Sequence, residues 1–204
     1  VHDVAPGAGQ AFHTAFGGTA DFANGILELR RDAGADVIVD DVIYFAEPMF
    51  QDGIIAQAVD TVVAEGANYY SSAGNGAAQS YESAYTATSV PGFFPGSTRH
   101  DFGAGTLDTL QSITLPVGRT VFISLQWSDR YFSAGGPPGA ASDIDLILYD
   151  ETGRAIAGAF ANNLGGDPVE VLSFTNSGPG TGFQLGIELF AGAAPERVKY
   201  VWFG

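Results

Sequence analysis

Cysteine and basic residues are what this sequence has least of. None of its 204 residues is cysteine, which excludes disulfides, thiol nucleophiles and cysteine-ligated zinc. Only 8 residues are lysine or arginine, against 23 aspartates and glutamates, so the formal net charge is −15. A negative surplus of this size repels phosphate backbones and anionic lipid head groups. We therefore expect no nucleic-acid partner.

Long apolar runs are missing as well. No stretch approaches the roughly 18–20 apolar residues that a membrane-spanning helix needs, so we expect no membrane span. Hydrophobic residues nevertheless make up 46% of the chain, which is enough for a globular core. The chain begins at Val1 and stops at a strand-like run before Gly204, which leads us to expect an internal piece of a longer protein.

Residues 1–76 alternate strand and helix signals, the pattern of βαβ units with a parallel sheet. The clearest element is a helix from Asp52 to Gly66, in which apolar residues recur at helical spacing. A second helix is expected from Asp21 to Arg31, and strands are expected over 10–16, 36–39 and 67–73. The sequence thus predicts a partial α/β domain in this part of the chain.

The remaining sequence changes character after Gly76. Residues 77–108 are rich in glycine, proline, serine and aromatics without helical periodicity, and we interpret them as a linking segment. Residues 109–204 carry only strand signals separated by turn residues, which predicts an all-β antiparallel sandwich of jelly-roll-like type. Its expected strands cover residues 112–115, 120–127, 144–149, 169–175, 183–190 and 197–203.

Several short motifs in residues 1–76 come in the order, and near the spacing, of one peptidase family. They are Val4-Ala5-Pro6-Gly7-Ala8, Gly34-Ala35-Asp36-Val37-Ile38, the helix from Asp52 to Gly66, and Tyr70-Ser71-Ser72-Ala73-Gly74-Asn75. Together they resemble the subtilisin-like serine peptidases. By this resemblance Asn75 would be the side-chain oxyanion donor, and Asp41, Val42 and Ile43 would line the groove for extended peptide. From its spacing alone, Asn75 is expected to be a turn residue, and the resemblance favours the oxyanion role.

The resemblance implies a parent enzyme rather than an active chain. The family's aspartate and histidine motifs do not occur here, and neither does its Gly-Thr-Ser-x-Ala nucleophile motif. We therefore expect a fragment of a secreted or cell-surface bacterial endopeptidase that acts on peptides. Its partners would be the remainder of that peptidase or copies of itself. The alternative is a non-enzymatic structural or assembly protein, or a pseudopeptidase, with the sandwich as an interaction module.

One acidic group in the predicted sandwich suits a metal ion. Asp143 and Asp145 alternate along a strand and so share a face, Asp150 lies in the next turn, and Asp167 lies in a later one. Oxygen-only ligands are typical of calcium sites. The sequence thus predicts a calcium site at these four residues, with a solvated acidic rim as the alternative. No other cofactor is indicated.

Overall fold

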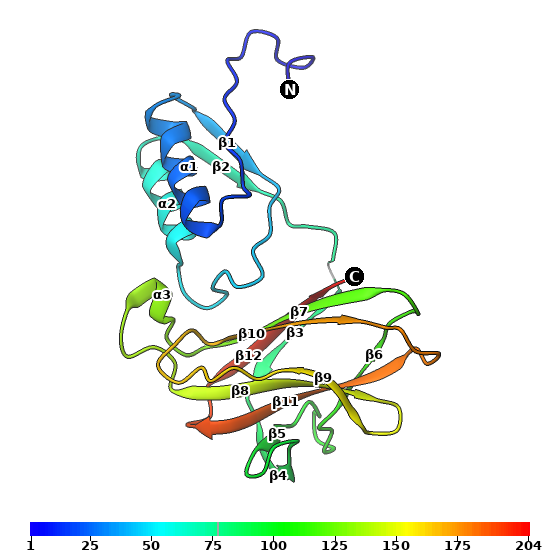
Figure 1. Ribbon diagram of the computed structural model, residues 1–204. Coiled ribbons are helices and arrows are strands. Elements are labelled where there is room, and N and C mark those ends of the chain that lie inside the picture. The colour runs from blue at the N-terminus through cyan, green and yellow to red at the C-terminus, as the bar shows by residue number, and fades with distance from the viewer. Residues whose placement is uncertain (77) are drawn as a thin grey trace. The chain divides into compact units, whose positions relative to one another are not determined.

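The computed structural model describes residues 1–76 and 78–204. The described chain contains twelve strands and three helices, so the protein is mostly β. It forms two compact units (Figure 1): the first comprises residues 1–47 and 52–74, and the second residues 48–51 and 75–204. Within the described part, no helix has the length and apolar character needed to cross a bilayer.

The first unit packs two helices against a pair of parallel strands. Helices α1 (Thr19–Arg31) and α2 (Ile54–Ala64) cover one face of β1 (Val37–Asp40) and β2 (Asn68–Ser71). The apolar stripes of both helices meet Ile38 in a small core, as their helical spacing predicts. On the opposite face of β1, Val37 and Val39 are exposed.

The predicted strand over residues 10–16 is wrong. These residues form no strand, and the side chains of Phe12 and Phe16 are 90% and 99% exposed. A strand needs a hydrogen-bonded neighbour, and among the described residues β1 pairs with β2 alone. The expected parallel sheet of the first unit is therefore reduced to two strands, and association through its open edges stays a prediction.

The second unit is a sandwich of two sheets, so the predicted β-sandwich is confirmed. One sheet has the strand order β10-β7-β12-β3 and the other β4-β5-β11-β8-β9, with β6 also paired to β11. Every strand pairing within the two sheets is antiparallel. The strands are β3 (Ser80–Ala84), β4 (Ala87–Pro91), β5 (Thr98–His100), β6 (Gln111–Thr114), β7 (Thr120–Trp127), β8 (Ser142–Asp150), β9 (Ala155–Ala159), β10 (Val169–Thr175), β11 (Gly182–Gly192) and β12 (Arg197–Phe203), and the short helix α3 is Phe132–Gly135.

The core lies between the two sheets. Strands β7 and β8 lie inside their sheets and supply the centre of the core. Alternate side chains of each strand point to the opposing sheet. Val121, Ile123 and Leu125 of β7 meet Ile144 and Leu146 of β8, and all five are buried. Eight of the nine residues of β8 are buried. Because successive residues of a strand point to opposite faces, side chains on both faces of β8 are covered.

The expected linking segment, residues 77–108, contributes strands to the sandwich. In it, β3 pairs with β12, and β5 pairs with β11 and β4. His100 at the end of β5 is fully buried; its Nδ1 accepts a hydrogen bond from the Thr86 amide at 3.1 Å, and its Nε2 lies 3.0 Å from the Tyr81 hydroxyl. Glycine and proline mark the turns here, but the strands between them are too short to show a clear period.

The role of residues 77–108 can be tested at His100. Burial lowers the pKa of His100 to about 4, so the ring is neutral at pH 7 and packs among Tyr81, Tyr85 and Phe102. We expect His100→Ala to lower the free energy of unfolding by about 2–4 kcal/mol. Urea denaturation at pH 7, followed by tryptophan fluorescence, measures this, because Trp127 and Trp202 both lie in the sandwich.

The exposed His2 provides the matched control. His2→Ala should leave the urea midpoint unchanged, because the side chain of His2 is not packed in a core. An equally unchanged midpoint for His100→Ala would show that this segment is peripheral to the fold.

Candidate ligand-binding site

Strand β8 carries acidic side chains on the face opposite the core. Ile144, Leu146 and Leu148 point into the core, so Asp143 and Asp145 lie on the other face. The two side chains are nevertheless largely shielded from water, because Asp143 and Asp145 are only 4% and 3% exposed. Two carboxylates are thus buried side by side on one strand.

A third buried carboxylate lies directly across the strand ladder. Glu188 of β11 is the Cα partner of Asp145 in β8 and is fully buried. Like charges at directly opposed positions destabilise a sheet unless other groups compensate them. On the other side of β8, Ala159 pairs with Leu146, so the next residue of that chain, Phe160, follows beside Asp145.

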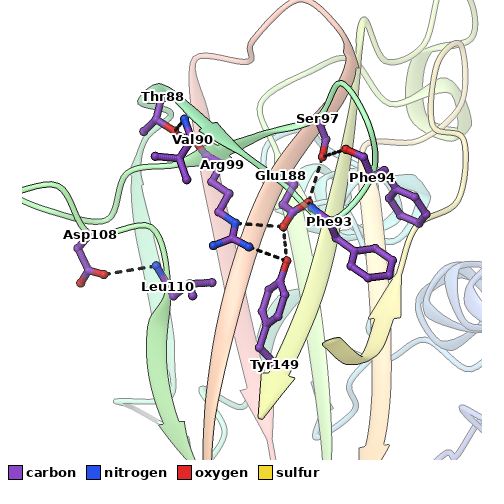
Figure 2. A network of polar contacts seen from close by, with 10 residues as sticks. All are labelled: Thr88, Val90, Phe93, Phe94, Ser97, Arg99, Asp108, Leu110, Tyr149 and Glu188. Atoms are coloured by element: carbon purple, nitrogen blue, oxygen red, sulfur yellow. Dashed lines mark hydrogen bonds and ion pairs between the residues drawn. The ribbon is translucent and has the colours of Figure 1, made fainter. Parts of the chain in front are cut away.

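Glu188 is well compensated, as Figure 2 shows. Its Oε1 accepts a hydrogen bond from the Tyr149 hydroxyl at 2.6 Å and lies 3.5 Å from Arg99 Nε in an ion pair. Its Oε2 accepts hydrogen bonds from the Phe93 amide at 2.5 Å and the Ser97 hydroxyl at 3.2 Å. This carboxylate therefore ties β8, β5 and the loop between β4 and β5 to β11.

The same contacts hold the β4–β5 loop, which brings one of three phenyl rings next to the acidic face. Gly92 allows the β4–β5 loop to approach, since a Cβ there would stand 2.2 Å from Glu188 Oε2. The loop presents Phe94, whose ring centroid lies 5.4 Å from that of Phe160 and 5.9 Å from that of Phe190. Phe190 is the extra residue of a β-bulge in β11, a feature that often redirects a side chain.

The three rings and the two aspartates line an open cavity of about 330 Å³, called the acidic cavity below. Phe160 and Phe190 are 58% and 45% exposed and form its rim. Asp143 Oδ1 accepts a hydrogen bond from the Asn163 amide at 3.2 Å. Among the described residues, no group donates a hydrogen bond to the Asp145 carboxylate or forms an ion pair with it. The lining consists of Phe94, Asp143, Asp145, Phe160, Asn162, Leu164, Phe190 and Ala191.

The acidic cavity holds more negative charge than the surrounding protein balances. Burial raises the pKa of Asp145 to about 7, and the neighbouring Asp143 and Glu188 add to the shift. Burial likewise raises the pKa of Glu170 on β10 to about 7, although a hydrogen bond from the Ala161 amide opposes the change. Arg99 is the basic residue of this region, and its ion pair is with Glu188.

The four residues predicted to bind calcium do not come together. Asp143 and Asp145 share the acidic cavity, but Asp150 stands at the far end of β8. At the rise of an extended strand it lies about 23 Å along the strand from Asp143 and about 17 Å from Asp145. Asp150 Oδ1 accepts hydrogen bonds from the Thr152 and Arg154 amides, and Asp167 accepts one from Ser133. Within residues 1–76 and 78–204, no three acidic or histidine side chains are grouped as a metal requires. Calcium binding itself stays a prediction.

The residues expected from the peptidase resemblance lie elsewhere. Asn75 is exposed in a bend that follows Gly74, whose φ is +68°, which fits the turn interpretation. Residues 41–43 form an exposed connection after β1 rather than a strand beside a groove. None of these residues lines the acidic cavity.

A second cavity, of about 480 Å³, lies at the turns that follow β8 and β10. Asp150, Glu151, Thr152 and Asn176 in its lining are already engaged in local hydrogen bonds. Asp150 closes its own turn, and Asn176 Nδ2 donates to the carbonyl oxygens of Leu115 and Gly180, both at 2.8 Å. The smaller acidic cavity is therefore the better candidate site, because Asp145 faces it without a partner.

Comparison with known proteins gives only distant similarity. No family model matches the chain, and no curated protein matches it. One similar solved structure is described as "CBM4 structure and function"; it is 15% identical, with a TM-score of 0.33, over 60% of this chain and 82% of that one. Another is an arabinose-bound α-L-arabinofuranosidase, MgGH51, 14% identical, with a TM-score of 0.29, over 62% of this chain and 23% of that one.

The predicted membership of the subtilisin-like peptidases is wrong. No family model matches the chain, the described chain is mostly β, and among the described residues its parallel sheet has two strands. Apart from one helix, the motifs behind the prediction are short runs rich in glycine, alanine and serine. Such runs specify local turns, which unrelated chains share. The predicted endopeptidase fragment rested on this membership and is therefore also wrong.

The sequence revealed the acidic half of the cavity but not its aromatic half. Alternation along β8 correctly placed Asp143 and Asp145 on one face. Phe94, Phe160 and Phe190 come from three separate segments, so no spacing in the sequence relates them. The pairing of β5 and β8 with β11, and of β9 with β8, brings these rings together.

The contrast between Asp145 and Glu188 gives a paired test of the site. We expect Asp145→Asn to raise the free energy of unfolding at pH 8 by about 1–3 kcal/mol, because it removes an uncompensated buried charge. We expect Glu188→Gln to lower it by about 3–5 kcal/mol, because Arg99 loses its buried partner. Urea denaturation of both variants at pH 8 measures the two effects.

The gain from Asp145→Asn should depend on pH. The pKa of Asp145 is raised from 3.8 to about 7 in the folded chain, so the native state keeps a proton that the unfolded state has lost. The free energy of unfolding of the wild type therefore falls as pH rises from about 4 to 7. The advantage of the variant should be small at pH 4 and complete above pH 7. The same gain at both pH values would contradict the raised pKa.

Proposed function

We propose that this protein is a non-enzymatic binding module whose sandwich takes a ligand in the acidic cavity. The proposal depends on one observation. Asp145 is 3% exposed, its carboxylate has no partner among the described residues, and it faces a cavity of about 330 Å³ edged by three phenyl rings. A largely apolar, preformed pocket with a few convergent polar groups is typical of ligand sites.

The arrangement of the carboxylates favours binding over catalysis. Glycoside hydrolysis, for example, uses two carboxyl groups that flank the scissile bond. Asp143 and Asp145 instead rise from one face of one strand, so both lie on the same side of a bound ligand. The described residues that line the cavity also include no serine, histidine or lysine, so they provide no nucleophile with an adjacent base.

A carbohydrate is a second candidate ligand. The observation that favours it is the combination of ring faces with carboxylates. Phe160 and Phe190 could pack against the apolar face of a sugar ring while Asp143 and Asp145 accept hydrogen bonds from its hydroxyls. The test below therefore includes neutral sugars.

Ligand titration followed by amide chemical shifts tests the proposed function. Neutral sugars, amines and carboxylic acids are added separately to the whole chain. We expect at least one of these classes to shift the amide signals of Asp145, Phe160 and Phe190 in a saturable way. The ligand should be recovered unchanged after prolonged incubation, as a binding module requires.

Two phenylalanine variants locate the binding. Phe160→Ala should weaken binding about tenfold, since it removes most of one wall of the cavity. Phe132→Ala, at an equally exposed phenylalanine in α3 outside the cavity, should leave affinity unchanged. If no class perturbs these signals, or if both variants behave alike, the acidic cavity is not a ligand site.

A further inference from the structure

The hydrogen-bonding groups of the acidic cavity are mostly acceptors. The three phenyl rings, Leu164 and Ala191 have no side-chain donor, and the carboxylates of Asp143 and Asp145 only accept when ionised. The Asn162 amide is the one side-chain donor of the lining, and its oxygen accepts from the Leu164 amide at 3.1 Å. A sugar hydroxyl both donates and accepts, whereas an ammonium or guanidinium group only donates, so the lining matches an organic cation better.

The charge of the region points the same way. Asp143, Asp145, Glu170 and Glu188 are all buried, and electrostatic coupling links Asp145 and Glu170 to their acidic neighbours. Arg99 compensates one of these carboxylates. Buried carboxylates without a counter-charge are costly in free energy. A ligand that brings one positive charge to Asp145 would relieve that cost on binding.

The aromatic wall distinguishes an organic cation from a metal ion. Calcium takes six to eight oxygen ligands, while five of the eight lining residues here are apolar and three of them are phenylalanines. An alkyl-ammonium or guanidinium group is attracted to the face of an aromatic ring, and this attraction is strongest where water is excluded. Phenyl rings beside buried carboxylates therefore suit a cation that carries hydrocarbon.

The dimensions of the cavity fit the end of a side chain. A volume of about 330 Å³ lies at the small end of the range for ligand pockets. Its rim is exposed, with Leu164 and Phe190 each 45% accessible, so a ligand held at Asp145 can continue into solvent. The net charge of −15 also attracts basic proteins over long range.

We infer that the acidic cavity binds an alkyl-ammonium or guanidinium group, as carried by a lysine or arginine side chain of a partner protein. This inference rests on the proposed function and assigns its ligand class. Asp145 accepts hydrogen bonds from the cation, Asp143 adds negative charge beside it, and the rings of Phe94, Phe160 and Phe190 surround its hydrocarbon part. Glu188 does not line the cavity; its hydrogen bonds hold the loop that presents Phe94.

Calorimetric titration of the whole chain at pH 7.5 and low salt tests the inference. The probes are the Nα-acetyl methylamides of lysine and arginine, with the Nε-acetyl-lysine and norleucine analogues as matched neutral controls. We expect the two charged probes to bind at least tenfold more tightly than the neutral ones, and added salt to weaken their binding. The diamine 1,4-diaminobutane is titrated as well, to tell whether the recognised cation belongs to a free small amine or to a protein side chain. Binding of the diamine or of the side-chain probes supports the inferred chemistry.

Two isosteric variants assign the charge effect to the cavity. Asp145→Asn should weaken the lysine probe at least tenfold, while Asp150→Asn, at the far end of β8, should not change its affinity. Tryptophan fluorescence checks that both variants are folded. Phe190→Ala should also weaken the probe and provides a second readout that leaves every carboxylate in place.

Several outcomes would overturn the inference. Equal affinity for lysine and its acetylated analogue would show that charge is not recognised. Binding of neutral sugars alone would keep the binding module but reject the cation. Calcium binding that Asp145→Asn abolishes, and that displaces the lysine probe, would make this a metal site. If none of the probes or sugars binds, the proposed function fails together with the inference.

Discussion

Two buried carboxylates that face each other across one strand pair determine the character of this protein's site. Asp145 of β8 and Glu188 of β11 are Cα partners in the ladder, and burial strengthens the repulsion between them. The fold resolves this conflict unequally. Arg99, Tyr149 and the β4–β5 loop satisfy Glu188, whereas Asp145 keeps a carboxylate without a partner in the described chain and a pKa raised to about 7.

This inequality gives the two carboxylates different roles. Glu188 acts as a structural anchor, because its hydrogen bonds hold the loop that places Phe94 over the sheet. Asp145 faces the acidic cavity that the loop and the bulge at Phe190 help to form. The rigid sandwich beneath them buries a continuous core, and such a scaffold can support the unfavourable charge of a site. Stability is thus given up locally where a ligand would restore it.

The regular part of the sandwich could be predicted from the sequence because its signals are local. Alternation in 120–127 and 144–149 defines strands, and it also places Asp143 and Asp145 on one face. The contributions of β3, β4 and β5 were missed because strands of three to five residues among glycines and prolines show little periodicity. The calcium prediction grouped Asp150 with Asp145 by closeness in sequence, although extended strand separates them widely. The aromatic wall depends on long-range pairing alone, which no local pattern reports.

The most direct test of this account is the titration of the Asp145 side-chain carboxyl by carbon-13 NMR, with and without the lysine probe. Asp143, Glu188, Glu170 and the more distant Arg99 are the charged groups around it, so its pKa reports the charge balance of the whole cavity. The account predicts a pKa of about 7 for the free chain and a fall of at least one unit when the probe saturates the site. An ordinary value near 3.8 in the free chain, or a raised value that the probe does not change, would contradict it.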